Sequence, residues 1–152
     1  MSSPLVLFGG TFDPVHRAHI SCARAVSKAL DGAKVELLPN AVPPHRDQPV
    51  ASAEDRLAML ALACAPHAEL TVNDWELSQS GPSWTRLTLE HFRSHIGQRP
   101  LVLVIGADSL ASLQHWRDWR QFPSLCHLVV LPRPGAGAPE QAVLDAFPEA
   151  SV

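Results

Sequence analysis

The sequence predicts an α/β fold in which five strands form a doubly wound parallel sheet in the order 3-2-1-4-5. Three observations support this prediction. Apolar runs at residues 5–8 and 101–105 have the character of buried parallel strands. Each run is followed by glycine and then by a segment with helical periodicity. The strand–helix–strand spacing at the start of the chain implies a right-handed parallel crossover.

The first half of the chain supplies three strands and two helices of this prediction. A helix is expected over residues 20–30, where Ile20, Ala23, Val26 and Leu30 share one face, and a second strand over 33–38. Ser52 and Asp55 form a capping box ahead of an amphipathic helix, and residues 69–75 form the third strand. Arg56 lies in the first turn of that helix, where a cation opposes the helix dipole. We expect its side chain to be exposed, the alternative being a partner such as a substrate anion.

The second half repeats the alternation of strands and helices. Ser83 is the expected N-cap of a helix that carries Thr85, Leu89, Phe92 and Ile96 on one face. The strand at 101–105 leads into Gly106 and an acidic helix start, and residues 127–131 form the fifth strand. Beyond Gly135 only residues 142–147 have the pattern of a short helix.

Composition limits the classes of function. A chain of 152 residues is expected to form one domain, and its net charge of −3 without a basic run argues against a nucleic-acid partner. There is no apolar run of membrane-spanning length and no secretory leader pattern, so we expect a cytoplasmic protein without a membrane partner. The three cysteines are widely spaced in apolar segments and are expected to be buried thiols. The sequence does not predict the oligomeric state.

The residues with the clearest chemical meaning run from Gly9 to His19, in the order Gly-Gly-Thr-Phe-Asp-Pro-Val-His-Arg-Ala-His. Two glycines at the end of a strand let the backbone approach a ligand closely. His16 and His19 are three residues apart at a helix start, where free N–H groups and the positive end of the dipole gather. Neither G-x-G-x-x-G nor a Walker A sequence is present. The segment therefore predicts an anion site, most plausibly for a phosphate.

Other segments carry weaker signals. His45 and Arg46 end a proline-stiffened loop after the second strand, which could be a phosphate clamp or an ordinary surface loop. Asp108 could accept from a ligand hydroxyl or only cap its helix. Trp116 and Trp119 are either stacking surfaces or packing residues. His91 and His95 have metal-ligand spacing but lack a third ligand, so solvent-facing histidines are expected.

The Gly9–His19 segment resembles the N-terminal signature of the nucleotidyltransferase superfamily with the H-x-G-H motif, and within it most resembles bacterial nicotinate mononucleotide adenylyltransferase, a Rossmann-like enzyme. The resemblance covers roughly residues 4–135 and includes the segments at 43–46, 83–85, 106–119 and 133. Three residues depart from the family pattern. Ala18 stands where glycine is usual, Gln79 where arginine is usual, and Trp84 where tyrosine is usual.

The resemblance implies adenylyl transfer in NAD biosynthesis, in which nicotinate mononucleotide and ATP give deamido-NAD and pyrophosphate. It implies that His16 and His19 donate to the phosphates in the transition state, and that Mg²⁺ is carried by the ATP phosphates, with no metal held by the protein itself. The residues implied to bind substrate or ATP are Gly9, Gly10, Thr11, Phe12, His45, Arg46, Thr85, Gly106, Asp108, Trp116 and Arg133.

One family feature is missing from the sequence. The family carries a C-terminal motif resembling Ile-Ser-Ser-Thr-x-Ile-Arg that binds the triphosphate, and no such motif occurs here. We therefore expect a single nucleotidyltransferase domain over 1–152 without the C-terminal region of the family. Three alternatives remain: a nucleotide-binding module without turnover, a related transferase acting on another phosphate substrate, and a metal-dependent hydrolase.

Overall fold

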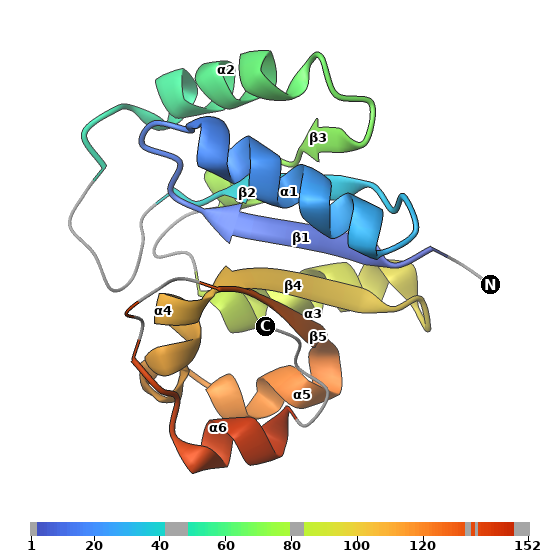
Figure 1. The fold of residues 1–152 in the computed structure, drawn as a ribbon, viewed down its shortest axis with the longest axis vertical. Helices are drawn as coiled ribbons and strands as arrows, with labels where there is room; N and C mark the ends of the chain where they lie inside the picture. Colours follow the sequence, from blue (N-terminus) through green and yellow to red (C-terminus); the bar gives the residue numbers. More distant parts are fainter. Residues whose placement is uncertain (1–2, 42–48, 80–83, 133–134, 136, 148–152) are drawn as a thin grey trace. The chain divides into compact units, whose positions relative to one another are not determined.

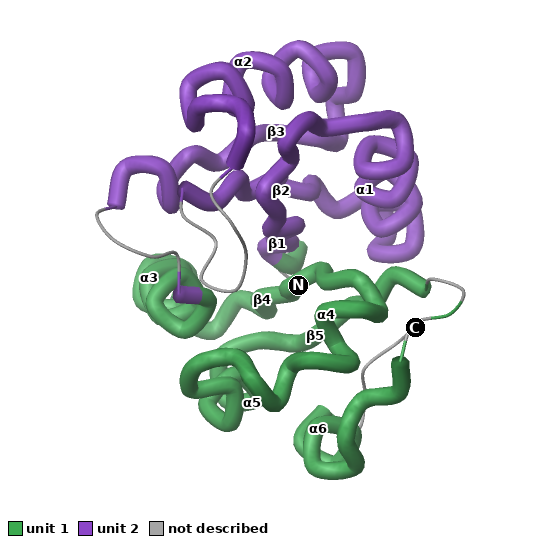
Figure 2. The backbone as a smooth tube through the Cα atoms, turned by 90° about the vertical axis from the view of Figure 1, so that its left-hand side faces the viewer, with its two compact units in different colours: residues 1–4, 85–152 green, residues 5–84 purple. Residues whose placement is uncertain are grey.

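The computed structural model describes residues 3–41, 49–79, 84–132, 135 and 137–147. They contain a five-stranded sheet in the order β3-β2-β1-β4-β5 (Figure 1). The pairs β1–β2, β2–β3 and β4–β5 are parallel. The predicted fold class and strand order are therefore confirmed. The chain divides into two compact units, one of residues 5–84 and one of residues 1–4 and 85–152 (Figure 2).

The unit of residues 5–84 is built from three strands and two long helices. Its elements are β1 (Leu5–Gly10), α1 (Arg17–Ala29), β2 (Val35–Pro39), α2 (Ala53–Cys64), β3 (Leu70–Val72) and the 3₁₀ turn η1 (Trp75–Ser78). Gly10 pairs with Pro39, so β1 and β2 end side by side. Helix α1 contacts β2, and α2 contacts β3. The core consists of fully buried aliphatic side chains, among them Val6, Leu7, Val35, Leu37 and Leu60.

The unit of residues 1–4 and 85–152 holds the other two strands. Its elements are α3 (Thr85–Ile96), β4 (Leu101–Gly106), α4 (Ala107–Ala111), η2 (Leu113–His115), η3 (Trp119–Gln121), α5 (Phe122–Leu125), β5 (His127–Leu131) and α6 (Gln141–Ala146). Leu89, Leu101, Val104, Leu113 and Phe122 are fully buried. Arg93 ties three chain segments of this unit together by donating to the carbonyls of Leu125, Gly97 and Arg99.

Two boundaries differ from the sequence-based expectation. Helix α1 begins at Arg17, three residues early, because His16 serves as its N-cap. Strand β3 ends at Val72 because the Asn73 side chain accepts a hydrogen bond from the Trp75 N–H at 3.0 Å. Such a local side-chain turn draws the backbone out of the ladder and into η1.

The expected exposed position of Arg56 is wrong. Arg56 is 1% exposed. It lies on the same face of α2 as the buried Leu60 and Cys64. Spacings of four and eight residues put these three side chains on one side of the helix. The sequence therefore contained the signal, but the charge of the side chain favoured the wrong interpretation.

The three predicted helix N-caps have different outcomes. Ser52 caps α2 as predicted, its Oγ accepting from the Asp55 N–H at 3.0 Å. The alternative of Asp108 as an N-cap is wrong, because Gly106 is the N-cap of α4. Ser83, the predicted cap of α3, lies outside the described residues.

The cysteines and the helices bear on two further expectations. All three cysteines are free thiols; Cys64 and Cys126 are buried as predicted, whereas Cys22 is only half-buried. None of the helices in the described ranges has both the length and the apolar character needed to cross a bilayer.

Candidate functional site

The two glycines that end β1 have different surroundings. A Cβ added to Gly10 would stand 3.2 Å from the ring of Phe12, a tight contact that a larger residue could make only if the ring shifted by a few tenths of an ångström. At Gly9 nothing lies within 4 Å of the equivalent point. Because that point is open, the backbone at Gly9 can be approached closely by a ligand, whereas Gly10 is filled from within the protein.

Phe12 shapes the loop that follows. Its φ of +50° lies in the left-handed region, which is uncommon for a bulky residue. The ring is 3% exposed and meets Phe8 and His19 edge-on, with centroids 5.7 and 5.0 Å away. The packing holds this backbone conformation and places an aromatic wall beside His19. A role of Phe12 in ligand binding stays a prediction, and it would involve its backbone, since the side chain is buried.

His16 and His19 form a stacked pair at the start of α1. Their ring centroids are 3.8 Å apart with an interplanar angle of 26°. The His16 N–H donates to Nδ1 of His19 at 3.1 Å, so the His19 side chain takes the place of the Glu or Gln of a capping box. Because Nδ1 accepts this bond, a neutral His19 ring carries its proton on Nε2. The two predicted donors are therefore brought together, and one has a defined tautomer.

The surroundings of His19 favour its neutral form. Partial burial lowers the pKa of His19, and the neighbouring His16 lowers it further. A neutral imidazole N–H donor at this position stands at a helix start that favours anions.

The carboxylate of Asp13, in the same loop, accepts from the N–H groups of Val50 and Ala51 at 2.6 and 2.9 Å. These two bonds hold the pKa of Asp13 below its usual value, with a smaller contribution from the charge of Arg56.

Two buried oxygen atoms at the ends of β1 and β2 lack a partner within the described part of the chain: Oγ1 of Thr11 and Oδ1 of Asn40. Buried polar atoms are normally hydrogen-bonded, so a group without a partner calls for an explanation such as a ligand or an ordered water. The sequence pointed to Thr11 but not to Asn40. Asn40 follows directly after β2, where a polar residue at a strand's carboxyl end was available as a signal.

Four described residues of the predicted binding set belong to the unit of residues 85–152. Thr85 is the first residue of α3 and is half-buried; Gly106 caps α4, and Asp108 is exposed in its first turn. Trp116 is half-buried and meets Phe122 edge-on at 6.3 Å. Trp119 is 7% exposed, so for this second tryptophan packing is the correct alternative. That these residues share a crevice with the Gly9–His19 loop stays a prediction.

Three predicted contacts, His45, Arg46 and Arg133, lie outside the described residues. Of the family departures, Ala18 is an exposed residue in the first turn of α1, so its methyl group does not enter the core. Gln79 is exposed and donates to the Trp75 carbonyl at 3.3 Å and to Ser78 Oγ at 3.0 Å. The remaining departure, Trp84, is half-buried.

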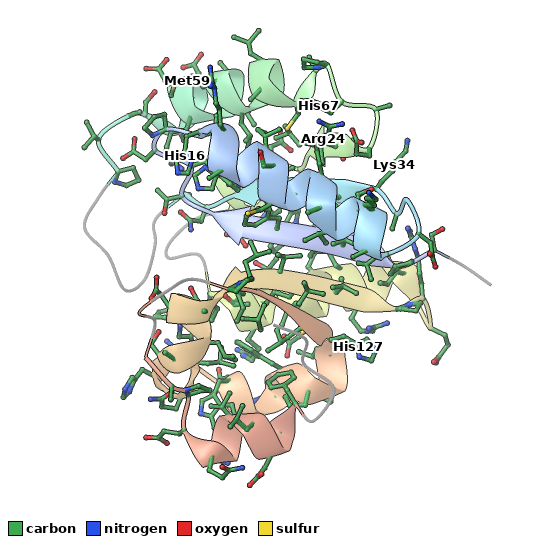
Figure 3. The ribbon with its side chains drawn as sticks, in the orientation of Figure 1. His16, Arg24, Lys34, Met59, His67 and His127 are labelled. Carbon is green, nitrogen blue, oxygen red and sulfur yellow. The ribbon has the colours of Figure 1, made fainter. Side chains whose placement is uncertain are left out.

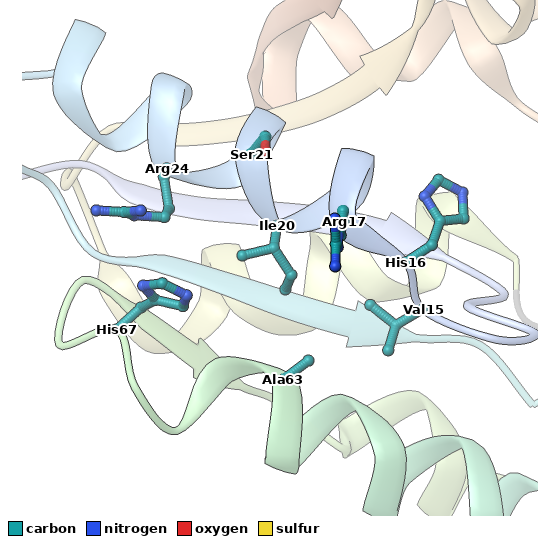
Figure 4. A pocket seen from close by; sticks show the side chains of 8 residues that line it. All are labelled: Val15, His16, Arg17, Ile20, Ser21, Arg24, Ala63 and His67. Carbon is teal, nitrogen blue, oxygen red and sulfur yellow. The ribbon is translucent and has the colours of Figure 1, made fainter.

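A groove of about 510 Å³ runs between α1 and α2 (Figure 4). Val15 and His16 lie at one end, and Arg24 and His67 at the other. At that far end Arg24 and His67 flank Glu69, with N–O distances of 3.7 and 4.0 Å, and Figure 3 shows the two side chains side by side. His16 is the one predicted site residue that lines this groove, so the groove does not contain the predicted site.

The structure gives little support to His91 and His95 as metal ligands. His95 is exposed as predicted, but His91 is half-buried; their rings lie 4.4 Å apart on α3. Among the described residues no three His, Cys, Asp or Glu side chains gather closely enough to hold a metal ion. The residues around His16 and His19 are donors and backbone amides, which suit an anion that brings its own metal.

Comparison with known proteins gives consistent relatives. The chain is 49% identical over 129 residues to a protein of Idiomarina loihiensis, 42% over 135 residues to one of Marinobacter nauticus, and 45% over 136 residues to one of Pectobacterium atrosepticum. Each is named "Probable nicotinate-nucleotide adenylyltransferase". The matches cover 85%, 88% and 89% of this chain but only 62%, 62% and 64% of the relatives. The chain thus spans less than two thirds of their length.

Solved structures agree on the fold. The nicotinic acid mononucleotide adenylyltransferase of Plasmodium falciparum in complex with NaAD superimposes with a TM-score of 0.84 at 15% identity, covering 98% of this chain and 73% of that one. Its complex with APC gives a TM-score of 0.81 at the same identity and coverage. The resemblance drawn from the Gly9–His19 segment is therefore confirmed. The model of the cytidylyltransferase-like family matches residues 7–151, nearly the whole length, and the chain belongs to that family.

Proposed function

We propose that this protein is a nicotinate-nucleotide adenylyltransferase, which joins nicotinate mononucleotide and ATP to give deamido-NAD and pyrophosphate. The observation that carries the proposal is the stacked His16–His19 pair at the start of α1, on the loop that follows the open Gly9 at the end of β1. The named relatives, between 42% and 49% identical, support this substrate class over others. Location in the cytoplasm is part of the proposal and is testable by cell fractionation.

In the proposed reaction a phosphate oxygen of the mononucleotide attacks the α-phosphorus of ATP. The bond from that phosphorus to the bridging oxygen breaks, and pyrophosphate leaves with the electron pair. A phosphate oxygen is already a nucleophile, so no strong base is needed, and catalysis consists of positioning and of neutralising charge. Nε2–H of His19 donates to the reacting phosphates, and His16 supplies a second donor beside it. Divalent metal, proposed to be Mg²⁺, arrives with ATP and neutralises part of the phosphate charge.

The other predicted contacts have supporting roles in this proposal. The backbone at Gly9 and Gly10 with the Thr11 hydroxyl forms the phosphate cradle, and Phe12 contributes backbone only. His45 and Arg46 clamp the phosphates. Thr85 and Trp116 hold the pyridine acid, and Gly106 and Asp108 take the nucleotide. Arg133 contacts the substrate.

The first test is the substitution His19→Ala. Losing one preorganised donor lowers kcat by about 10² or more. Pyrophosphate release from nicotinate mononucleotide and ATP is measured, and deamido-NAD is identified by chromatography. His115→Ala is the matched control, because His115 is an exposed histidine in η2 and its loss leaves kcat unchanged. Unchanged turnover in His19→Ala contradicts the catalytic role of His19.

Assays with other phosphate substrates distinguish the proposed function from its alternatives. Parallel assays replace nicotinate mononucleotide by nicotinamide mononucleotide or by phosphopantetheine. Product only with phosphopantetheine overturns the proposed substrate but keeps the transferase. Calorimetric binding of the mononucleotide without any product supports a binding module in place of an enzyme.

A further inference from the structure

We infer that Arg56 is a positioning residue for His16 and His19. This inference rests on the proposed function. The residue is 1% exposed, and within the described part of the chain its guanidinium donates to four backbone carbonyls. One nitrogen, Nη1, donates both to Thr11 O at 2.8 Å and to Asn40 O at 2.7 Å. Thr11 follows β1 and Asn40 follows β2, so one group joins the carboxyl ends of two strands.

Further bonds connect Arg56 with the chain on either side of the 42–48 segment. Nε donates to Ala51 O at 3.3 Å and Nη2 to Ala41 O at 3.5 Å. A planar guanidinium holds several acceptors in fixed directions at once, which an ammonium group cannot do. The side chain therefore fixes three segments relative to one another: the loop from Thr11 to His16, called here the phosphate loop, the end of β2 and the start of α2.

Asp13 makes the reciprocal connection. Its carboxylate, in the phosphate loop, holds the N–H groups of Val50 and Ala51 just before α2. Arg56, in α2, holds the carbonyl of Thr11 in the loop. Two crossed ties between the same two segments restrict both sliding and rotation of the loop. Burial lowers the pKa of Arg56 and the charge of Asp13 raises it, and an arginine at neutral pH stays charged in either case.

The loop held in this way leads directly into the histidine pair. It runs from Thr11 to His16, whose N–H sets the tautomer of His19. Catalysis by positioned donors is sensitive to displacement, and a shift of about 1 Å can cost about 10²-fold in rate. Arg56 touches neither ring, so its effect on the reaction passes through the loop.

Arg93 offers a matched control. It is half-buried and, like Arg56, donates to backbone carbonyls of other chain segments, at Gly97, Arg99 and Leu125. Those segments belong to the unit of residues 85–152 and do not include the phosphate loop. Replacing Arg93 therefore removes the same kind of bonds without loosening the loop.

The experiment compares the variants Arg56→Lys, Asp13→Asn and Arg93→Lys, each made in the full chain, with the wild type. Turnover is measured by pyrophosphate release, and hydrogen exchange of the His16 and Ala51 amides by NMR, under conditions where circular dichroism shows each variant folded. We expect Arg56→Lys to lower kcat by about 10- to 100-fold and to speed exchange at both amides. Asp13→Asn leaves the core intact because Asp13 is half-exposed, and it lowers kcat and speeds exchange at both amides as Arg56→Lys does. Arg93→Lys lowers the melting temperature and changes neither.

The outcomes separate this inference from the proposed function. Unchanged exchange at both amides in Arg56→Lys and Asp13→Asn overturns the positioning role, whatever the turnover. Faster exchange with unchanged kcat also overturns it, because the loop then moves without consequence for the reaction. A wild-type chain that releases no pyrophosphate refutes the proposed function, and the exchange rates still report whether Arg56 holds the loop.

Discussion

At the scale of single residues, the main finding is that His19 is held neutral with Nε2 as its donor. Its pKa lies below the ordinary 6.5, chiefly because of burial and then because of the neighbouring His16. A His pKa lowered by folding means that the neutral form stabilises the fold above the unfolded pKa, and that this stability is lost as pH falls through the folded pKa. Protonation of Nδ1 also breaks the bond from the His16 N–H.

This predicts a titration that NMR of the imidazole nitrogens can follow. In the wild type His19 titrates below 6.5. In His16→Asn, which keeps a good N-cap residue, the pKa of His19 rises but stays below its ordinary value because burial remains. His115→Asn serves as the control and leaves the His19 titration where it was. A wild-type midpoint above 6.5, or no movement in His16→Asn, contradicts the described environment of the pair.

Single residues also mark where sequence reasoning stopped. The Gly9–His19 segment was recognisable because strand, glycines and helix start follow one another locally. The role of Arg56 was not, because its partners Thr11 and Asn40 are 45 and 16 residues away in the sequence. The spacing of Arg56 with Leu60 and Cys64 signals a place on the buried face of α2, but only the fold reveals which carbonyls receive its guanidinium.

At the scale of elements, the caps of α1 and α2 show what a local pattern can predict. Ser52 was identified as a cap because serine followed three residues later by an acidic residue is a usual helix start. The start of α1 was placed three residues late, because histidine is not among the usual cap residues and the cap works through the side chain of His19. Boundaries defined by common capping chemistry are therefore predictable, and those defined by functional residues are not.

The cap of α2 yields a stability prediction. Ser52→Ala removes the acceptor for the Asp55 N–H and lowers the free energy of unfolding by about 0.5–2 kcal/mol. Urea denaturation followed by circular dichroism measures it. Ser21→Ala is the control: Ser21 is an exposed serine within α1, where alanine is the better helix former, so its stability stays equal or rises slightly. Equal losses in both variants speak against the Ser52 cap.

At the scale of the whole molecule, strand order and fold class followed from periodicity, because buried parallel strands are apolar on both faces and sequential crossovers are right-handed. The short turns η2, η3 and α5 between residues 113 and 125 were not predicted. They contain no long periodic segment, and their conformation depends on burying Leu113, Trp119 and Phe122. Long-range packing thus decides the regions that local patterns leave open.

Each compact unit carries one buried thiol, and these thiols report on the two units separately. Cys64 belongs to residues 5–84 and Cys126 to residues 85–152. Burial raises the pKa of Cys64 and raises that of Cys126 to about 12. Since the thiolate is the reactive form, iodoacetamide at pH 8 should label the half-buried Cys22 first and the two buried thiols at least about 100-fold more slowly.

Mass spectrometry of peptides after timed labelling measures the three rates. Cys22→Ser removes the fast label and leaves the two slow rates unchanged, which identifies the fast site. In Leu60→Ala the cavity beside α2 destabilises residues 5–84, so labelling of Cys64 accelerates. Acceleration of Cys64 without Cys126 means that the two units open independently, and equal acceleration means that they unfold together. Fast labelling of either buried thiol in the native wild type contradicts the packing described for its unit.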